Sequence, residues 1–277
     1  MDVKVEVIKP EMGAVVHASR ENFKDPEFAA LCTELLDKHG ALVFPEVGLS
    51  DAEQLAFTDL MGKRINFMHK LPGSDVSAQD VYTITLDPTV NHEPEYVLGS
   101  MFWHGDGICS DIPPPKYTLL SCKVPPEKDG ETEFCNTVNA WAALPEEEKT
   151  KLRGLRVKHS VVAAVREVAP KEQLDPKRQS MTHEHPLVWK QQSGRETLLI
   201  GWTADEIVGM PKPQARALLT RLLEWAAQPR FSCCHTWKKG DFAIWDNTGA
   251  LHRARPYADT SKRRMHRTSV GGVEAIT

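Results

Sequence analysis

Apolar residues recur along the chain at two spacings, which predict helices and short strands in the same molecule. Asp25 and Pro26 suit the N-cap and the first position of a helix. The apolar stripe that follows them consists of Phe28, Leu31, Cys32, Leu35 and Leu36. An apolar stretch at 41–44 is typical of a buried strand, and Ser50 with Glu53 forms a capping box for a second helix. The first 70 residues therefore predict the order strand, helix, strand, helix.

The rest of the chain shows one further clear helix and many short strands. The helical stripe consists of Ala215, Leu218, Leu219, Leu222, Leu223 and Ala226. Strand patterns occupy 117–123, 131–136, 231–237, 241–245, 251–254 and 265–270. Short strands at turn-sized intervals are typical of a closed or double-sheet β architecture with helices packed outside. We expect one mainly β domain over 1–277, with flanking helices.

Two segments have weak periodicity and many polar residues, at about 70–100 and 161–185. Both are too long for ordinary loops, so we expect them to be lid-like insertions, partly strand in the first case. The tripeptide of His183, Glu184 and His185 lies at the end of the second segment, and we expect it to be exposed.

Composition and net charge argue against nucleic-acid-binding and membrane-associated functions. Hydrophobic residues make up 41% of the 277 residues and charged residues 26%, as in ordinary globular proteins. The net charge of −4 argues against a nucleic acid or an anionic membrane as the main partner. The apolar runs are too short to cross a bilayer, and the alternating N-terminus is unlike a signal peptide. Six cysteines without a Cys-x-x-Cys pair predict free thiols, so we expect a cytoplasmic protein.

Three local features carry possible chemistry. His104 and Asp106 lie two residues apart, so on a strand their side chains point to one face. This pair with one further imidazole would suit a facial iron site, although most such pairs are surface groups. His252 follows a tight turn, where a core histidine is the usual interpretation. Arg263 and Arg267 lie on one side of a strand, either on a solvated edge or inside a barrel where each could bind a carboxylate or sulfonate.

Together these features resemble the iron(II)- and 2-oxoglutarate-dependent dioxygenases of the taurine dioxygenase/TfdA type. The shared order is Trp103-His104-Gly105-Asp106, a Pro-Pro turn before Gly130-Glu131-Thr132, Trp245-Asp246-Asn247, His252-Arg253, and arginines 11 and 15 residues after His252. The similarity extends over most of the chain and thins at 70–100 and 161–183. It implies a double-stranded β-helix core, which is the jelly roll of cupin-like proteins.

The resemblance also implies a set of site residues. His104, Asp106 and His252 would be the ligands of Fe(II) and thus the catalytic centre. Thr132 and Arg263 would hold the distal carboxylate of 2-oxoglutarate, with Trp245 packed beside this co-substrate. The substrate contacts would be Arg267, His69 and Ser100. Ser100 stands where the taurine enzyme has an asparagine, and Thr248 replaces a frequent arginine after Trp-Asp-Asn.

The expected function is oxidation by O2 of a small organic acid, of the aryloxyalkanoate or alkylsulfonate type, with release of succinate and CO2. Two alternatives stay open. One is a biosynthetic hydroxylase or desaturase of the same family that acts on an amino-acid-derived metabolite. The other is a non-catalytic jelly-roll module that binds an anion through the same arginines. Because relatives commonly self-associate, we also expect a homo-oligomer.

Overall fold

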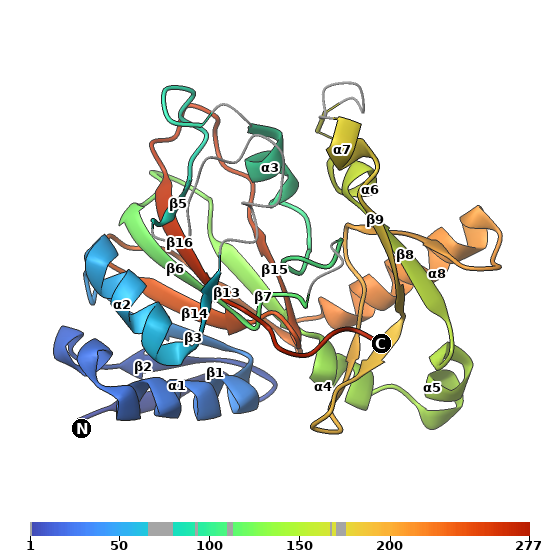
Figure 1. Ribbon diagram of the computed structural model, residues 1–277, viewed down its shortest axis with the longest axis horizontal. Helices are drawn as coiled ribbons and strands as arrows, with labels where there is room; N and C mark the ends of the chain where they lie inside the picture. The colour runs from blue at the N-terminus through green and yellow to red at the C-terminus, as the bar shows by residue number, and fades with distance from the viewer. Residues whose placement is uncertain (1, 66–79, 92–93, 110–112, 167, 170–175) are drawn as a thin grey trace.

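Two sheets that pack face to face form the centre of the protein (Figure 1). The computed structural model describes residues 2–65, 80–91, 94–109, 113–166, 168–169 and 176–277. The large sheet has the order β1 (Lys4–Lys9), β2 (Met12–His17), β3 (Ala41–Phe44), β14 (Phe242–Asp246), β6 (Tyr117–Val124), β16 (Arg264–Val270) and β4 (Arg64–Ile65), and β5 (Tyr82–Ile84) also pairs with β16. The opposing sheet has the order β13 (Ser232–His235), β7 (Thr132–Asn136) and β15 (Ala250–Ala254).

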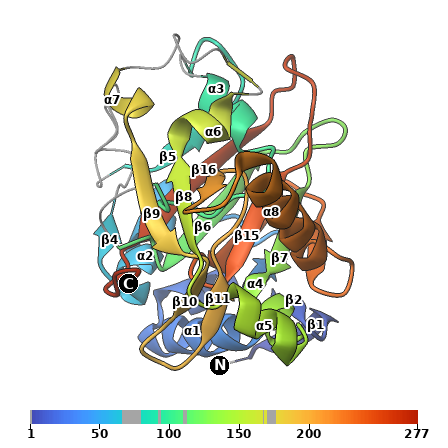
Figure 2. The same ribbon diagram turned by 90° about the vertical axis from the view of Figure 1, so that its right-hand side faces the viewer.

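Helices cover the outer faces of this sandwich. The 3-10 helix η1 (Arg20–Lys24), α1 (Pro26–His39) and α2 (Asp51–Met61) pack on the large sheet (Figure 1). On the other side lie α4 (Thr137–Ala142), α5 (Glu146–Leu152) and the long α8 (Lys212–Ala226) (Figure 2). Two small sheets lie on the same side as these helices. One consists of β12 (Ala204–Ile207), β8 (Arg156–Ser160) and β9 (Thr182–Pro186). The other consists of β10 (Val188–Lys190) and β11 (Glu196–Leu198). Three short helices complete the described part: α3 (Pro94–Gly99), α6 (Val161–Val165) and α7 (Pro176–Gln179).

Strand β14 shows how the sequence builds two cores at once. All five of its residues are buried, because neither face of this central strand meets solvent. Phe242 and Ile244 point to the helices, where they join an aromatic cluster around Phe23. Ala243 and Trp245 point between the two sheets. The period of two along the strand thus separates the outer core from the inner one.

The predicted fold class is confirmed: the molecule is mainly β, with a double-stranded β-helix core and helices outside. The N-terminal region differs from the prediction in one respect. Where the sequence predicts a single strand before the first helix, the structure has an antiparallel hairpin of β1 and β2. The capping residues are as predicted. Asp25 accepts a hydrogen bond from Glu27 N, and Ser50 and Glu53 form a reciprocal capping box.

The prediction that the 183–185 tripeptide is exposed was wrong for His185. This residue belongs to β9, is 4% exposed, and its Nε2 donates to the carbonyl of Ile108 at 2.9 Å. Its register partner is Val157, so it shares the covered face of β8 and β9 with His159. Pairing between strands buries this histidine, which the local polarity of the sequence did not indicate.

Over the described ranges, no helix combines the length and apolar character that a membrane crossing requires.

Candidate metal centre

His104, Asp106 and His252 come together at one end of the space between the two sheets. His104 and His252 form an isolated antiparallel bridge with backbone hydrogen bonds of 3.0 and 2.9 Å. One potential ligand atom from each of the three residues lies within 4.8 Å of the other two. Within the described part of the chain, this is the one group of three histidine, cysteine or carboxylate side chains with such spacing.

The local contacts orient all three side chains. Nδ1 of His104 lies 2.7 Å from the carbonyl of Phe102, which can only accept, so this nitrogen carries the proton and Nε2 has the free lone pair. Nε2 of His252 faces Oδ1 of Asp106 at 4.0 Å. The other Asp106 oxygen, Oδ2, accepts a hydrogen bond of 2.8 Å from the hydroxyl of Thr118. Two imidazole nitrogens and one carboxylate oxygen therefore converge.

The protonation states also suit a divalent cation. Burial lowers the pKa of His104 and lowers that of His252 well below its ordinary value. Burial by itself raises the pKa of Asp106, but the charge of Arg267, together with the hydrogen bond from Thr118, lowers it overall. Neutral imidazoles beside an ionised carboxylate are the state that binds a metal ion. Two histidines with one carboxylate are also the donor set of non-haem Fe(II) oxygenases, so the residues present fit that ion.

A second group of predicted residues lies at the start of β7. Arg263 is 3% exposed and donates from Nε to the carbonyl of Gly130 at 3.2 Å. Its guanidinium lies over the ring of Tyr257, and burial lowers the pKa of Arg263. No carboxylate among the described residues lies within 4.0 Å of this guanidinium. A buried cation of this kind is ready to bind an anionic ligand.

Thr132 lies two residues after Gly130, whose carbonyl accepts the hydrogen bond from Arg263. Its hydroxyl accepts a hydrogen bond of 2.9 Å from the indole N–H of Trp237. An indole nitrogen only donates, so the hydroxyl proton of Thr132 is available for another acceptor. Thr132 and Arg263 thus present two donors from neighbouring positions.

Four further residues were predicted to contact the substrate or the co-substrate: Arg267, Trp245, Ser100 and His69. Arg267 lies over the ring of Tyr82, with Nη1 at 3.6 Å from Oδ1 of Asp106. Trp245 packs its ring against that of His252, with centroids 4.5 Å apart. Ser100 binds β15 through its backbone carbonyl, which accepts from Ala254 N, and its hydroxyl donates to Val97 O at 2.6 Å. His69 lies outside the described residues.

Sequence reasoning missed several residues that border this centre. The rings of Phe102 and Trp202 stack at 4.0 Å with an angle of 7° between their planes. Trp202 N donates to the carbonyl of Trp103, directly before His104. The two rings are only partly buried, and this aromatic wall is linked to the His104 segment through the backbone of Phe102 and of Trp202. The one sequence signal for this wall was the position of Phe102 in the motif, because Trp202 is about a hundred residues away.

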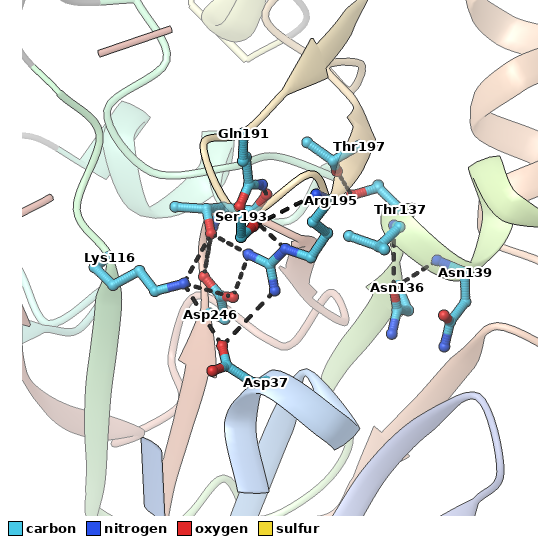
Figure 3. A network of polar contacts seen from close by, with 12 residues as sticks. Asp37, Lys116, Asn136, Thr137, Asn139, Gln191, Ser193, Arg195, Thr197 and Asp246 are labelled. Carbon is cyan, nitrogen blue, oxygen red and sulfur yellow. Dashed lines mark hydrogen bonds and ion pairs between the residues drawn. The ribbon is translucent and has the colours of Figure 1, made fainter. Parts of the chain in front are cut away.

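The turn after β14 is anchored by a network of ion pairs around the buried carboxylate of Asp246 (Figure 3). Asp246 is 1% exposed and accepts from Arg195 Nη2 at 2.7 Å and from Lys116 Nζ at 3.1 Å. Thr248 also contributes its backbone N–H and hydroxyl to Asp246. Asp37 of α1 lies 3.9 Å from both cations. Arg195 also contacts the hydroxyl of Thr248, so its guanidinium supplies a positive charge beside the turn.

Cys233, Cys234 and His235 contribute to no metal cluster among the described residues. His235 instead contacts Asp241, with 2.9 Å between Nε2 and Oδ2. All six cysteines are free thiols, of which Cys234 is exposed.

Comparison with known proteins adds three findings. The model of the taurine catabolism dioxygenase TauD, TfdA family matches residues 4–269. The chain is 33% identical over 251 residues to the alpha-ketoglutarate-dependent 2,4-dichlorophenoxyacetate dioxygenase of Burkholderia sp. (strain RASC). The aligned region covers 86% of this chain and 83% of that protein. It is 29% identical over 266 residues to the (S)-phenoxypropionate/alpha-ketoglutarate-dioxygenase of Delftia acidovorans, covering 90% and 87% of the two chains. The crystal structure of AAD-2 in complex with Mn(II) and N-oxalylglycine superimposes with a TM-score of 0.83, at 27% identity and full coverage of both chains.

Proposed function

The chain belongs to the taurine catabolism dioxygenase TauD, TfdA family, and from that premise we propose that its substrate is a small aryloxyalkanoic acid. The protein is a 2-oxoglutarate-dependent non-haem iron dioxygenase, which requires Fe(II), 2-oxoglutarate and O2. Similarity to such enzymes along most of the chain disfavours a non-catalytic module, and the named relatives disfavour an amino-acid-derived substrate.

The proposal assigns His104, Asp106 and His252 to Fe(II). When bound, Fe(II) with 2-oxoglutarate and O2 supplies the oxidising chemistry, and 2-oxoglutarate leaves as succinate and CO2. Arg263 and Thr132 hold the distal carboxylate of 2-oxoglutarate. Two observations support this assignment: the buried Arg263 guanidinium has no carboxylate partner among the described residues, and the hydroxyl proton of Thr132, two residues from the Arg263 contact Gly130, is available. Trp245 supports His252 from the side and closes the co-substrate pocket.

The observation that carries the substrate class is the position of Arg267. Its guanidinium lies 3.6 Å from the Asp106 carboxylate, so an acid group bound to Arg267 places the neighbouring carbon next to the metal centre. We assign the aryl group of the substrate to the flat apolar surface of the stacked rings of Phe102 and Trp202, which are partly exposed and adjoin the His104 segment. Ser100 is a further substrate contact in this proposal.

The chemistry predicts a diagnostic product. A hydroxyl group placed on the carbon that bears the ether oxygen gives a hemiacetal or hemiketal, which breaks into a phenol and an aldehyde or keto acid. We therefore expect phenoxyacetate or 2-phenoxypropionate to stimulate O2 consumption, with one succinate and one phenol formed per turnover.

The test is a matched panel of substrates with Fe(II) and 2-oxoglutarate. Neutral phenoxyethanol keeps the ring and the ether but lacks the acid group, so it should stimulate O2 consumption far less than phenoxyacetate. Alkylsulfonates form the second arm, because a sulfonate also suits Arg267. Equal rates with phenoxyethanol and phenoxyacetate, or turnover of alkylsulfonates alone, would contradict the aryloxyalkanoate assignment.

We also propose a cellular compartment and an assembly state. The six free thiols support a reducing compartment, so we place the protein in the cytoplasm. We further propose that it self-associates, which sedimentation of the purified protein would measure.

A further inference from the structure

Four buried residues behind the metal centre form a continuous chain of hydrogen bonds. Trp245 Nε1 lies 3.0 Å from Asn247 Oδ1, Asn247 Nδ2 lies 2.8 Å from Thr118 Oγ1, and this hydroxyl lies 2.8 Å from Asp106 Oδ2. The four residues are between 0% and 7% exposed. Solvent therefore does not compete for these contacts.

The donor and the acceptor of every hydrogen bond in this chain follow from Trp245, its first residue. The indole N–H of Trp245 can only donate, so the amide of Asn247 must present its oxygen to Trp245 and its nitrogen to Thr118. An amide nitrogen also only donates, so the Thr118 hydroxyl accepts from Asn247. Its single proton is then left for Asp106 Oδ2.

We propose that Trp245, Asn247 and Thr118 are positioning residues, which form a one-way hydrogen-bond chain that reserves Oδ2 of Asp106 and leaves only Oδ1 for the metal ion. This inference rests on the proposed function, in which Asp106 is a metal ligand. The geometry supports it: Thr118 contacts Oδ2, whereas Oδ1 is the oxygen that faces His252 Nε2 at 4.0 Å, with Arg267 Nη1 at 3.6 Å from it. A carboxylate fixed in this way would bind a metal ion through one oxygen rather than through both.

The fold explains why the chain forms at this position. Thr118 and Trp245 are register partners on β6 and β14, so the strand pairing brings the hydroxyl next to the turn. Trp245 also packs on the His252 ring, with centroids 4.5 Å apart. Asp246 points the opposite way, into the network with Arg195 and Lys116 (Figure 3). The turn thus contacts His252 directly through Trp245 and reaches Asp106 through Thr118, while Asp246 anchors it to Arg195 and Lys116.

Two substitutions test the direction of the chain. Thr118→Val keeps the shape of the side chain but removes the donor to Asp106. Asn247→Asp keeps the shape of residue 247 but replaces the donating nitrogen by an accepting oxygen, which takes the Thr118 proton away from Asp106. Both variants should bind Mn(II) roughly 10- to 100-fold more weakly than the wild type, the usual effect of losing the outer partner of a metal ligand. Thr118→Ser restores the donor and should recover most of the affinity.

Thr58→Val is the matched control. Thr58 is also fully buried, and its hydroxyl contacts Gln54 O and Thr268 on the other face of the large sheet. This variant should lose stability in a thermal melt but bind Mn(II) as the wild type does. Mn(II) affinity is measured from the electron paramagnetic resonance signal of the free ion, and the visible absorption of the anaerobic Fe(II)–2-oxoglutarate complex is recorded for each variant.

The outcomes separate the inference from the proposed function. Weaker binding and a shifted absorption band in Thr118→Val and Asn247→Asp, with recovery in Thr118→Ser, support the positioning role. Wild-type affinity and an unchanged band in folded Asn247→Asp would overturn it, even if Thr118→Val does not fold. A wild-type protein that binds no Mn(II) would overturn the proposed function itself and this inference with it.

Discussion

Replacement of Arg195 by methionine should show how strongly the network behind the metal centre stabilises the fold. Methionine keeps an apolar stem of similar length but removes the guanidinium that lies 2.7 Å from Asp246. Loss of one partner of a fully buried ion pair costs about 3–5 kcal/mol, and a hydrogen bond to a charged group contributes about 1.5–3 kcal/mol. Here Lys116 still contacts the same oxygen at 3.1 Å, and Arg195 is 20% exposed. We therefore expect a loss of about 2–3 kcal/mol in the free energy of unfolding.

The assay is urea unfolding at pH 7, followed by tryptophan fluorescence, with Arg195→Met compared in two backgrounds. In the Asp246→Asn background the buried carboxylate is gone, so the same substitution should cost much less. Arg156→Met is the control, because its partner Glu184 and Arg156 itself are each 47% exposed, and an exposed pair contributes little. A loss below about 0.5 kcal/mol, or an equal loss in both backgrounds, would refute the importance of the buried pair.

The pH dependence gives a second check of the same reasoning. Burial raises the pKa of Asp246, but the charges of Arg195 and Lys116 lower it overall. A carboxyl with a lowered pKa in the folded state adds stability above its unfolded pKa of about 3.9, and this stability is lost as the pH falls through the folded pKa. The difference between the wild type and Arg195→Met should therefore be complete at pH 7 and shrink below about pH 4. A difference that stays constant across this range would mean that charge is not its origin.

Three further predictions concern the site and the core. Asp106→Ala should abolish both Mn(II) binding and succinate production, and retained turnover would contradict its role as a ligand. Arg267→Gln should raise KM for an acidic substrate while sparing 2-oxoglutarate binding, whereas Arg263→Gln should weaken 2-oxoglutarate binding; the reverse pattern in steady-state kinetics would mean that the two roles are exchanged. Phe57→Ala should lower the free energy of unfolding by about 3–5 kcal/mol in urea, because its fully buried ring packs edge-on against Phe23; a loss below about 1 kcal/mol would show that the aromatic cluster repacks.

Sequence patterns predicted most of the elements, because local spacing carries that information. The stripe after Pro26 became α1, and the stripe before Pro229 became α8. The capping box at Ser50 formed as expected, since both of its partners lie within one helical turn. The error at His185 has the opposite origin. Its burial depends on pairing with β8 and on the Ile108 carbonyl, 77 residues away.

The sequence by itself determined the family, the double-stranded β-helix and the residues of the Trp-His-x-Asp and His-Arg motifs. Motif order and local periodicity are properties of the sequence and can be read without a structure. Only the tertiary structure decided how those side chains are oriented. Thr118 and Asn247 are 129 residues apart, and Arg195 and Asp246 are 51 apart. No local pattern encodes such contacts, since they arise when strand register brings two buried polar groups together and burial then requires each to have a partner.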